Sequence, residues 1–193
     1  MPPWLLPVGM TVVALAVIFV ALYLFSQQRP ASSPPGVPST AATGQTVDGV
    51  QCQSSEQVAY HIHTHLAIFV DGQPQTVPYG IGIPSPQVDN SGSEPFVVGG
   101  SCFYWLHSHT EDGVIHVESP VQRTFTLGDY FDIWSQPLSP SRVGSDTGPV
   151  IAYLNGQRYE GDLRAIPLAA HSVIQLNVGT DVAPRPYTFP PNY

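Results

Sequence analysis

The sequence predicts an all-β domain, a small sandwich or barrel with one short helix, preceded by an N-terminal transmembrane helix. Three observations support this prediction. Short segments of alternating polarity recur after about residue 50 and are separated by turns rich in Gly, Pro, Asn and Ser, which is typical of β domains. Residues 126–134 are the best helix candidate there, with apolar side chains at spacings of three and four. Residues 5–25 form an uncharged apolar run of 21 residues, long enough to cross a bilayer.

The chain divides into three segments by composition. Residues 1–27 form the anchor, and the length of the run, with no Ala-x-Ala site directly after it, favours this reading over a cleaved signal peptide. Residues 28–49 are rich in Pro, Ser, Thr and Gly and predict a flexible tether. Residues 50–193 have the size of one domain.

Two cysteines, Cys52 and Cys102, each lie a few residues before a histidine-rich segment. A disulfide between them would join the starts of two strands and would indicate an oxidising compartment, whereas two buried thiols are the alternative. The charges that flank residues 5–25 give almost no orientation signal. We therefore expect a single-pass cell-membrane protein with its domain on the extracytoplasmic side.

The charge balance excludes two classes of function. The chain has 6 Lys and Arg residues, all of them arginine, against 14 Asp and Glu, for a net charge of −8. Nucleic acid is a poor partner for such a surface, and the absence of lysine excludes Schiff-base catalysis. The expected partners are the membrane, which the N-terminal helix would cross, and a membrane protein beside it.

The first histidine-rich segment, residues 59–70, predicts a strand. Its three histidines alternate with apolar residues, so their imidazoles share one face: His61, His63 and His65. Asp71-Gly72 predicts a tight turn into a second strand within residues 73–78. Pro74 and Pro78 indicate that this second strand is short or at a sheet edge.

The second histidine-rich segment predicts a hairpin of residues 103–109 and 114–118. A two-residue turn at Asp112-Gly113 would place His109 opposite His116, whereas a four-residue loop over residues 110–113 would place His107 there. Both registers keep the three histidines and Glu118 on one face, because side chains alternate along a strand.

The rest of the domain is predicted from turns and spacing. A helix over residues 126–134 would begin at Thr126, with Asp129 completing a capping box. The remaining expected elements are a loop at 79–100, a loop at 138–148, a hairpin of 150–154 and 157–159 around Asn155-Gly156, and a last strand at 173–178.

The two histidine-rich segments together predict a transition-metal site. Histidines two apart on a strand lie about 6–7 Å apart, so both rings can reach one ion. The candidate ligands are more numerous than one tetrahedral ion needs. Some of them could bind a second ion, support the ligands of the first ion by hydrogen bonds, or face solvent. They are His61, His63, His65, His107, His109, His116 and Glu118. His171 is expected to be structural or a surface residue.

The domain is expected to lack the soft sulfur ligands, free cysteine and methionine, which leaves Cu(II) or Zn(II) as the expected metal. Met1 and Met10 lie outside the domain, and both cysteines are expected in a disulfide. Two readings without a metal remain open: the rings could line the solvated face of a sheet, or they could form a proton-sensing cluster.

Several motifs are similar to those of a known group of proteins. His61-Ile-His-Thr-His-Leu66, Cys102-Phe-Tyr-Trp-Leu-His-Ser-His109 and Gly113-Val-Ile-His-Val-Glu118 resemble a family of small, membrane-anchored, extracytoplasmic prokaryotic proteins that has no assigned activity. The resemblance covers roughly residues 50–180 and implies one domain outside the membrane.

Three functions fit these expectations. The first is binding, buffering or delivery of Cu(II) or Zn(II). The second is a metal-dependent enzyme that uses a three-histidine site to activate water or to carry out copper redox chemistry. The third is a metal-stapled accessory subunit of a membrane complex.

Overall fold

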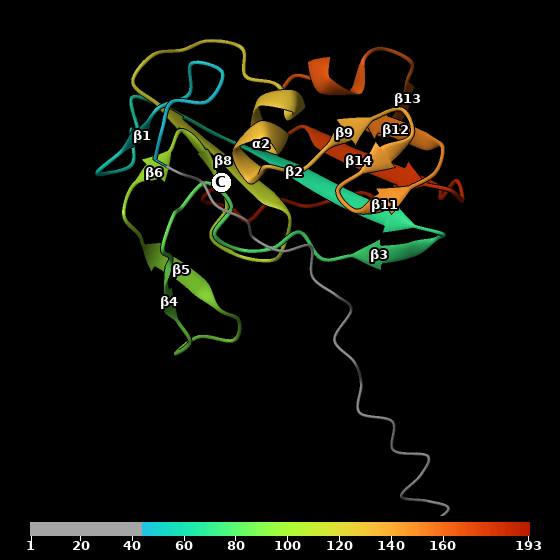
Figure 1. Ribbon diagram of the computed structural model, residues 1–193. Helices are drawn as coiled ribbons and strands as arrows, with labels where there is room; N and C mark the ends of the chain where they lie inside the picture. Colours follow the sequence, from blue (N-terminus) through green and yellow to red (C-terminus); the bar gives the residue numbers. More distant parts are fainter. Residues whose placement is uncertain (1–43) are drawn as a thin grey trace, which may run out of the picture. The chain divides into compact units, whose positions relative to one another are not determined.

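The computed structural model describes residues 44–193. The predicted anchor, residues 1–27, and the tether up to residue 43 lie outside the described residues. Among residues 44–193, no helix is both long and apolar enough to cross a membrane. The described chain is mostly β-sheet with one short α-helix, in agreement with the predicted fold class (Figure 1).

A seven-stranded sheet forms the centre of the domain. Its strand order is β13-β12-β14-β2-β8-β7, with β3 paired to β2, and the β14–β2 pair is its one parallel pair among the described residues. The strands are β2 (Tyr60–Val70), β3 (Gln73–Gln75), β7 (Leu106–His107), β8 (Val114–Ser119), β12 (Val150–Leu154), β13 (Gln157–Tyr159) and β14 (Val173–Val178).

Strand β2 changes neighbours near its middle. Residues 60–65 pair with β8, whereas residues 65–70 pair with β14. Leu66 and Ile68 lie in the hydrophobic core, so the second half of β2 belongs to the core while the first half carries the histidines on its other face.

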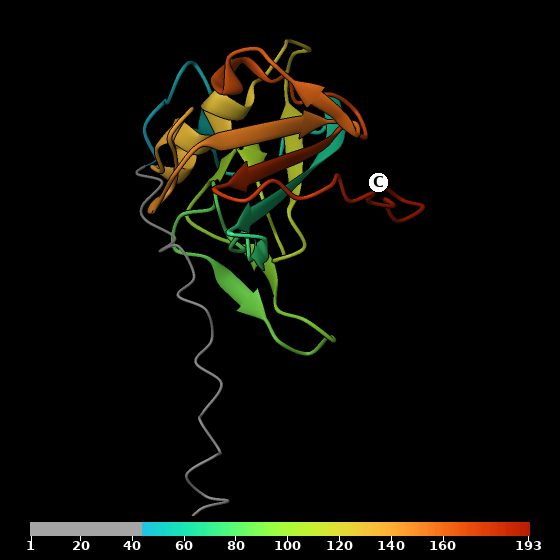
Figure 2. The ribbon, with the colours of Figure 1, turned by 90° about the vertical axis from the view of Figure 1, so that its right-hand side faces the viewer.

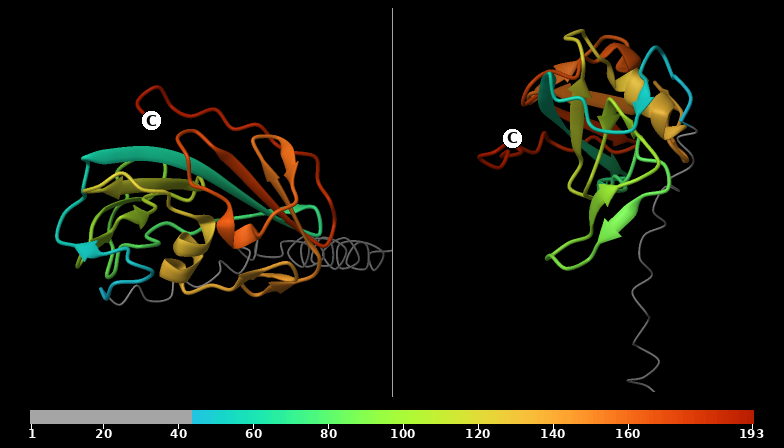
Figure 3. Two further views of the ribbon diagram at one scale, coloured as in Figure 1. Left: turned by 90° about the horizontal axis from the view of Figure 1, so that it is seen from above. Right: turned by 90° about the vertical axis from the view of Figure 1, so that its left-hand side faces the viewer.

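The predicted helix is confirmed as α2 (Leu127–Trp134). Thr126 caps it, and its hydroxyl accepts from the backbone N–H of Asp129 while the Asp129 carboxylate accepts from the N–H of Thr126. Tyr130, Phe131 and Trp134 are buried in the core beneath the sheet. Figure 3 shows α2 and the C-terminal segment on opposite sides of β2.

Two predicted loops contain short strands, so those predictions were wrong in detail. Residues 79–100 include the hairpin of β4 (Gln87–Asp89) and β5 (Phe96–Gly99), and residues 138–148 include β9 (Leu138–Ser139), β10 (Arg142–Val143) and β11 (Asp146–Thr147). Strands of two to four residues are too short to show a period-two pattern, and their Gly, Pro and Ser neighbours signalled only turns.

The turns of two hairpins match their dipeptides. Asp71 and Gly72 have φ angles of 48° and 83°, and Asn155 and Gly156 have φ angles of 52° and 78°. Positive φ at both central residues is the primed turn expected for Asp-Gly and Asn-Gly. The hairpins β2–β3 and β12–β13 are therefore confirmed.

The C-terminal segment folds back along the sheet rather than leaving it (Figure 2). Two buried amides of β14 hold its backbone: Gln175 donates to the Val182 carbonyl and accepts from the N–H of Arg185, and Asn177 donates to the Val182 carbonyl. This anchoring carries residues 186–193 across the histidine-bearing face of β2.

Candidate metal centre

Three neighbouring strands bring the two histidine-rich segments together. On β8, His116 lies directly opposite His63 of β2 on one side and opposite His107 of β7 on the other. The four-residue loop is thus the register found for the second hairpin. His116 is central, with ring centroids 4.5 Å from His63, 4.7 Å from His109 and 5.4 Å from His107.

The loop of residues 110–113 is held by side-chain hydrogen bonds. The Thr110 hydroxyl donates to Asp112 Oδ1 at 2.7 Å, and the same oxygen accepts from the backbone N–H of Val114 at 3.0 Å. The Gly113 carbonyl accepts from the N–H of Leu66 on β2. These contacts fix the longer loop, and Asp112 acts as a turn residue as expected.

Strand alternation is interrupted before His107. Tyr104, Trp105 and Leu106 all lie in the hydrophobic core, so Trp105 does not share the histidine face as a continuous strand would require. The chain separates there into β6 (Phe103–Tyr104) and β7. This break lets consecutive aromatic and aliphatic side chains fill the core while His107 still turns toward His116.

We call His107 and His109 the inner pair. Their Nε2 atoms lie 3.1 Å apart. Each Nδ1 is bound to a backbone carbonyl, that of Tyr104 at 2.8 Å for His107 and that of Val97 at 2.6 Å for His109. A carbonyl only accepts, so both Nδ1 atoms carry the proton.

Burial keeps the inner pair neutral. It lowers the pKa of His107 to about 3, with neighbouring His116 and His109 lowering it further, and burial also lowers the pKa of His109. With Nδ1 protonated and the ring neutral, each Nε2 carries a lone pair. Two lone pairs therefore face each other across 3.1 Å, an arrangement that a cation between them would relieve.

We call His61 and His63 the outer pair. Their Nε2 atoms also lie 3.1 Å apart. Burial lowers the pKa of His63 to about 4, whereas the side chain of His61 is 39 % exposed. The outer pair therefore lies at the boundary between the interior and solvent.

Glu118 lies between the two pairs. Its Oε1 is 3.1 Å from His61 Nε2 and 3.3 Å from His116 Nδ1, and its Oε2 is 3.9 Å from His107 Nε2. Burial opposes ionisation, but the hydrogen bond from His116 and the nearby His61 together outweigh it and hold the pKa of Glu118 below its usual range. Oε2 is buried and has no hydrogen-bond partner among residues 44–193.

The ligand spacing suits tetrahedral coordination. Nitrogen ligands about 2.0 Å from a zinc ion lie about 3.3 Å apart, close to the 3.1 Å separations within both pairs. Among residues 44–193, three sets of three side chains each have ligand atoms within 4.8 Å of one another: His61, His63 and His116; His107, His109 and His116; and Glu56, His107 and Glu118.

Two histidines lie outside these sets. His65 Nε2 donates to the Asp112 carbonyl at 3.0 Å, and its ring stacks on Tyr187 at 3.7 Å between centroids, so the structure does not join it to the other predicted ligands. His171 is exposed and its Nε2 is 2.8 Å from the Tyr193 carbonyl oxygen, in keeping with a surface role.

A cavity of about 450 Å³ opens beside the outer pair, His109 and His116. Its wall includes three side chains that the sequence did not single out. Glu56 Oε1 lies 3.4 Å from His109 Nε2, Phe96 stacks on the His109 ring at 4.8 Å, and the Tyr193 ring lies 4.3 Å from that of His63. Burial, together with the charge of Glu118, raises the pKa of Glu56.

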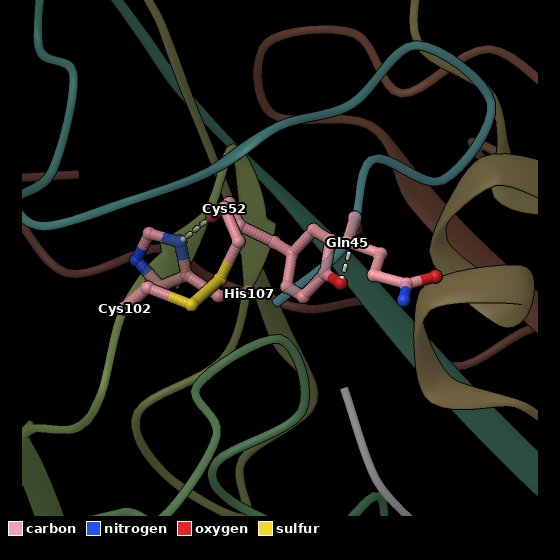
Figure 4. The surroundings of a disulfide bond; sticks show 5 residues. Gln45, Cys52, Cys102 and His107 are labelled. Carbon is pink, nitrogen blue, oxygen red and sulfur yellow. Dashed lines mark hydrogen bonds between the residues drawn. A yellow bond between two sulfur atoms is a disulfide. The ribbon is translucent and has the colours of Figure 1, made fainter. Parts of the chain in front are cut away.

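The predicted disulfide is present between Cys52 and Cys102 and joins β1 (Cys52–Gln53) to the start of β6. Figure 4 shows the His107 ring beside this disulfide, with the dashed hydrogen bond from its Nδ1. Behind β7, Gly82 has a φ angle of 74°, and a Cβ there would lie 2.3 Å from the Leu106 carbonyl oxygen. The disulfide and the close approach of residue 82 thus both restrain the backbone beside the inner pair.

Comparison with protein-family models, curated proteins and solved structures gives no match. The proposed function is therefore based on the geometry of the side chains in this site.

Proposed function

We propose that this protein binds Cu(II) or Zn(II) through its histidine cluster, for acquisition, buffering or delivery of the metal. The observation that carries this proposal is the inner pair, in which two neutral imidazoles direct their Nε2 lone pairs at each other across 3.1 Å. Both Nδ1 atoms are already bound to carbonyls, so the Nε2 atoms are the free ligand atoms.

A metal ion explains this arrangement better than a proton does. A shared proton would place a charge on rings whose burial already lowers the pKa to about 3 for His107. A divalent cation accepts both lone pairs at once and brings the Glu118 carboxylate into use as a counter-charge. Neutral imidazole suits Zn(II) and Cu(II), and the described domain offers no free thiol for a softer ion.

The surroundings favour an exchangeable site over a purely structural one. His61 is 39 % exposed, and the cavity of about 450 Å³ gives access to the cluster. A metal that only staples a fold is normally enclosed by four protein ligands. The same cavity supports a second candidate, a metal-dependent enzyme with an open coordination position that activates water.

The cellular setting completes the proposal. The disulfide supports an oxidising compartment, and the apolar run of residues 5–25 would anchor the domain on the extracytoplasmic side of the cell membrane. A membrane protein that receives or supplies the ion is the expected partner for delivery.

Elemental analysis of the untagged full chain tests the proposal. The protein, purified without a metal-affinity column, is expected to contain or take up stoichiometric Zn or Cu. His107→Ala should lower the metal content and keep the disulfide-bonded fold by circular dichroism. His171→Asn is the matched control, because it removes an imidazole outside the cluster and asparagine tolerates the φ angle of 58° there. Less than about a tenth of an equivalent, with none loadable, would exclude all metal-based functions.

An activity assay separates the two candidates. Zinc-loaded protein that hydrolyses an activated ester or phosphoester, with the activity lost in His107→Ala, would favour the enzyme. Loaded protein that lacks such activity but yields its metal to a competing chelator would favour binding and delivery.

A further inference from the structure

The two histidine pairs are built as separate ligand sets. Each pair has its own Nε2 contact of 3.1 Å, near the edge length of a tetrahedral site. The three-histidine sets that contain them share only His116. One ion bound at one pair would leave the Nε2 atoms of the other pair in contact with each other and without a metal.

Glu118 reaches both sets with different oxygens. Oε1 lies near His61 and His116, at 3.1 and 3.3 Å, and Oε2 faces His107 at 3.9 Å. The side chain is 4 % exposed, and Oε2 has no hydrogen-bond partner among residues 44–193. An unpartnered buried carboxylate oxygen is costly, and a cation beside the inner pair would satisfy it.

We propose that the centre is binuclear, with an outer ion held by His61 and His63, an inner ion held by His107 and His109, His116 shared between the two sets, and Glu118 bridging the ions through its two oxygens. This inference rests on the proposed function, since it treats the cluster as a metal site, and it adds the number of ions and the role of the carboxylate. A bridging carboxylate holds two ions close together, and pairs about 3.5–4 Å apart can act on one bound oxygen.

The cavity places the outer ion at the entrance and the inner ion behind it. The cavity wall includes both outer histidines but only His109 of the inner pair, and His107 is fully buried. The two ions therefore differ in access although their ligands are of the same kind. We expect the inner site to load through the outer one.

Copper titration of the metal-stripped, untagged full chain tests this inference. Binding should saturate at about two equivalents of Cu(II). At saturation, electron paramagnetic resonance should show two coupled Cu(II) ions, with most of the signal of isolated copper lost.

Glu118→Gln isolates the bridge, because glutamine keeps the shape and removes the charge and one acceptor oxygen. It should abolish the coupling and weaken the second binding event by at least about 10-fold, in the range expected for residues that support metal sites. Glu160→Gln is the matched control, because Glu160 is exposed and its contact is to Arg158.

Each outcome decides between the claims. Saturation at one equivalent would overturn the binuclear centre and leave the metal-binding function standing. Two uncoupled ions that Glu118→Gln does not disturb would overturn the bridge. No binding at all would overturn both this inference and the proposed function.

Discussion

The inner pair, His107 and His109, and the outer pair, His61 and His63, come from the same His-x-His spacing but have different surroundings. Both inner rings are held by a backbone carbonyl at Nδ1, and they are 0 % and 6 % exposed. The outer pair includes a ring that is 39 % exposed and borders the open cavity. One motif thus yields a preorganised, desolvated pair and an accessible one. We expect tight, slow binding at the inner pair and faster exchange at the outer pair.

The largest effect is expected from removal of the disulfide beside the inner pair. Cys52→Ala with Cys102→Ala opens a loop with a sequence separation of 50. Loop-closure entropy predicts a loss of about 4 kcal/mol in the free energy of unfolding. Urea denaturation of the metal-free double variant measures this loss. A value near zero would mean that the disulfide does not stabilise the domain.

Removal of the shared ring should weaken both sites. His116 belongs to both three-histidine sets, so His116→Ala should lower affinity at each site by at least about 100-fold, or about 2.7 kcal/mol, the upper range for supporting residues. Competition with a chromophoric chelator measures both affinities. Loss at one site alone would assign His116 to that site and sharpen the comparison.

Acid should destabilise the metal-free domain through its buried rings. The pKa of His107 is about 3 in the folded state and near 6.5 when the chain unfolds. The unfolded state therefore binds more protons between these values, and stability falls as the pH falls from about 7 to 4, by about 3 kcal/mol. Urea denaturation across this range measures the slope. His107→Phe should reduce the slope, and the part that remains should come from His63 and His109, whose pKa is also lowered by burial.

The smallest effect is expected from the C-terminal cover of the outer pair. The Tyr193 ring lies 4.3 Å from His63, so Tyr193→Ala should speed metal release from the outer site by a few-fold, equivalent to about 1 kcal/mol. Stopped-flow transfer to a chelator measures the rate. An equal change at the inner site would show that Tyr193 affects the whole domain.

Local patterns predicted the elements that frame the site. Alternating polarity identified β2 and β8, and Asp71-Gly72 and Asn155-Gly156 identified the turns of the β2–β3 and β12–β13 hairpins. Thr126 with Asp129 identified the start of the helix. These features depend on neighbours within a few residues, so the sequence is sufficient to find them.

Long-range contacts set what the sequence could not predict. His65 follows the same alternation as His61 and His63. However, its ring stacks on Tyr187 and its Nε2 donates to the Asp112 carbonyl, so it does not join the cluster. Glu56 lies in no recognisable motif, although it reaches His109. The choice between two hairpin registers likewise depended on the Gly113 carbonyl meeting β2. The polar Gln175 and Asn177 within an apolar strand were the one local sign of the C-terminal contact.

The central claim is that imidazoles from two separate strand segments bind the same metal centre. X-ray absorption spectroscopy of the zinc-loaded, untagged full chain tests it most directly. We predict a first shell of nitrogen ligands at about 2.0–2.1 Å with the scattering signature of several imidazoles, with less bound zinc in His107→Ala and the same amount in His171→Asn. A shell of oxygen ligands alone, or the same zinc content in His107→Ala as in the natural sequence, would contradict the account.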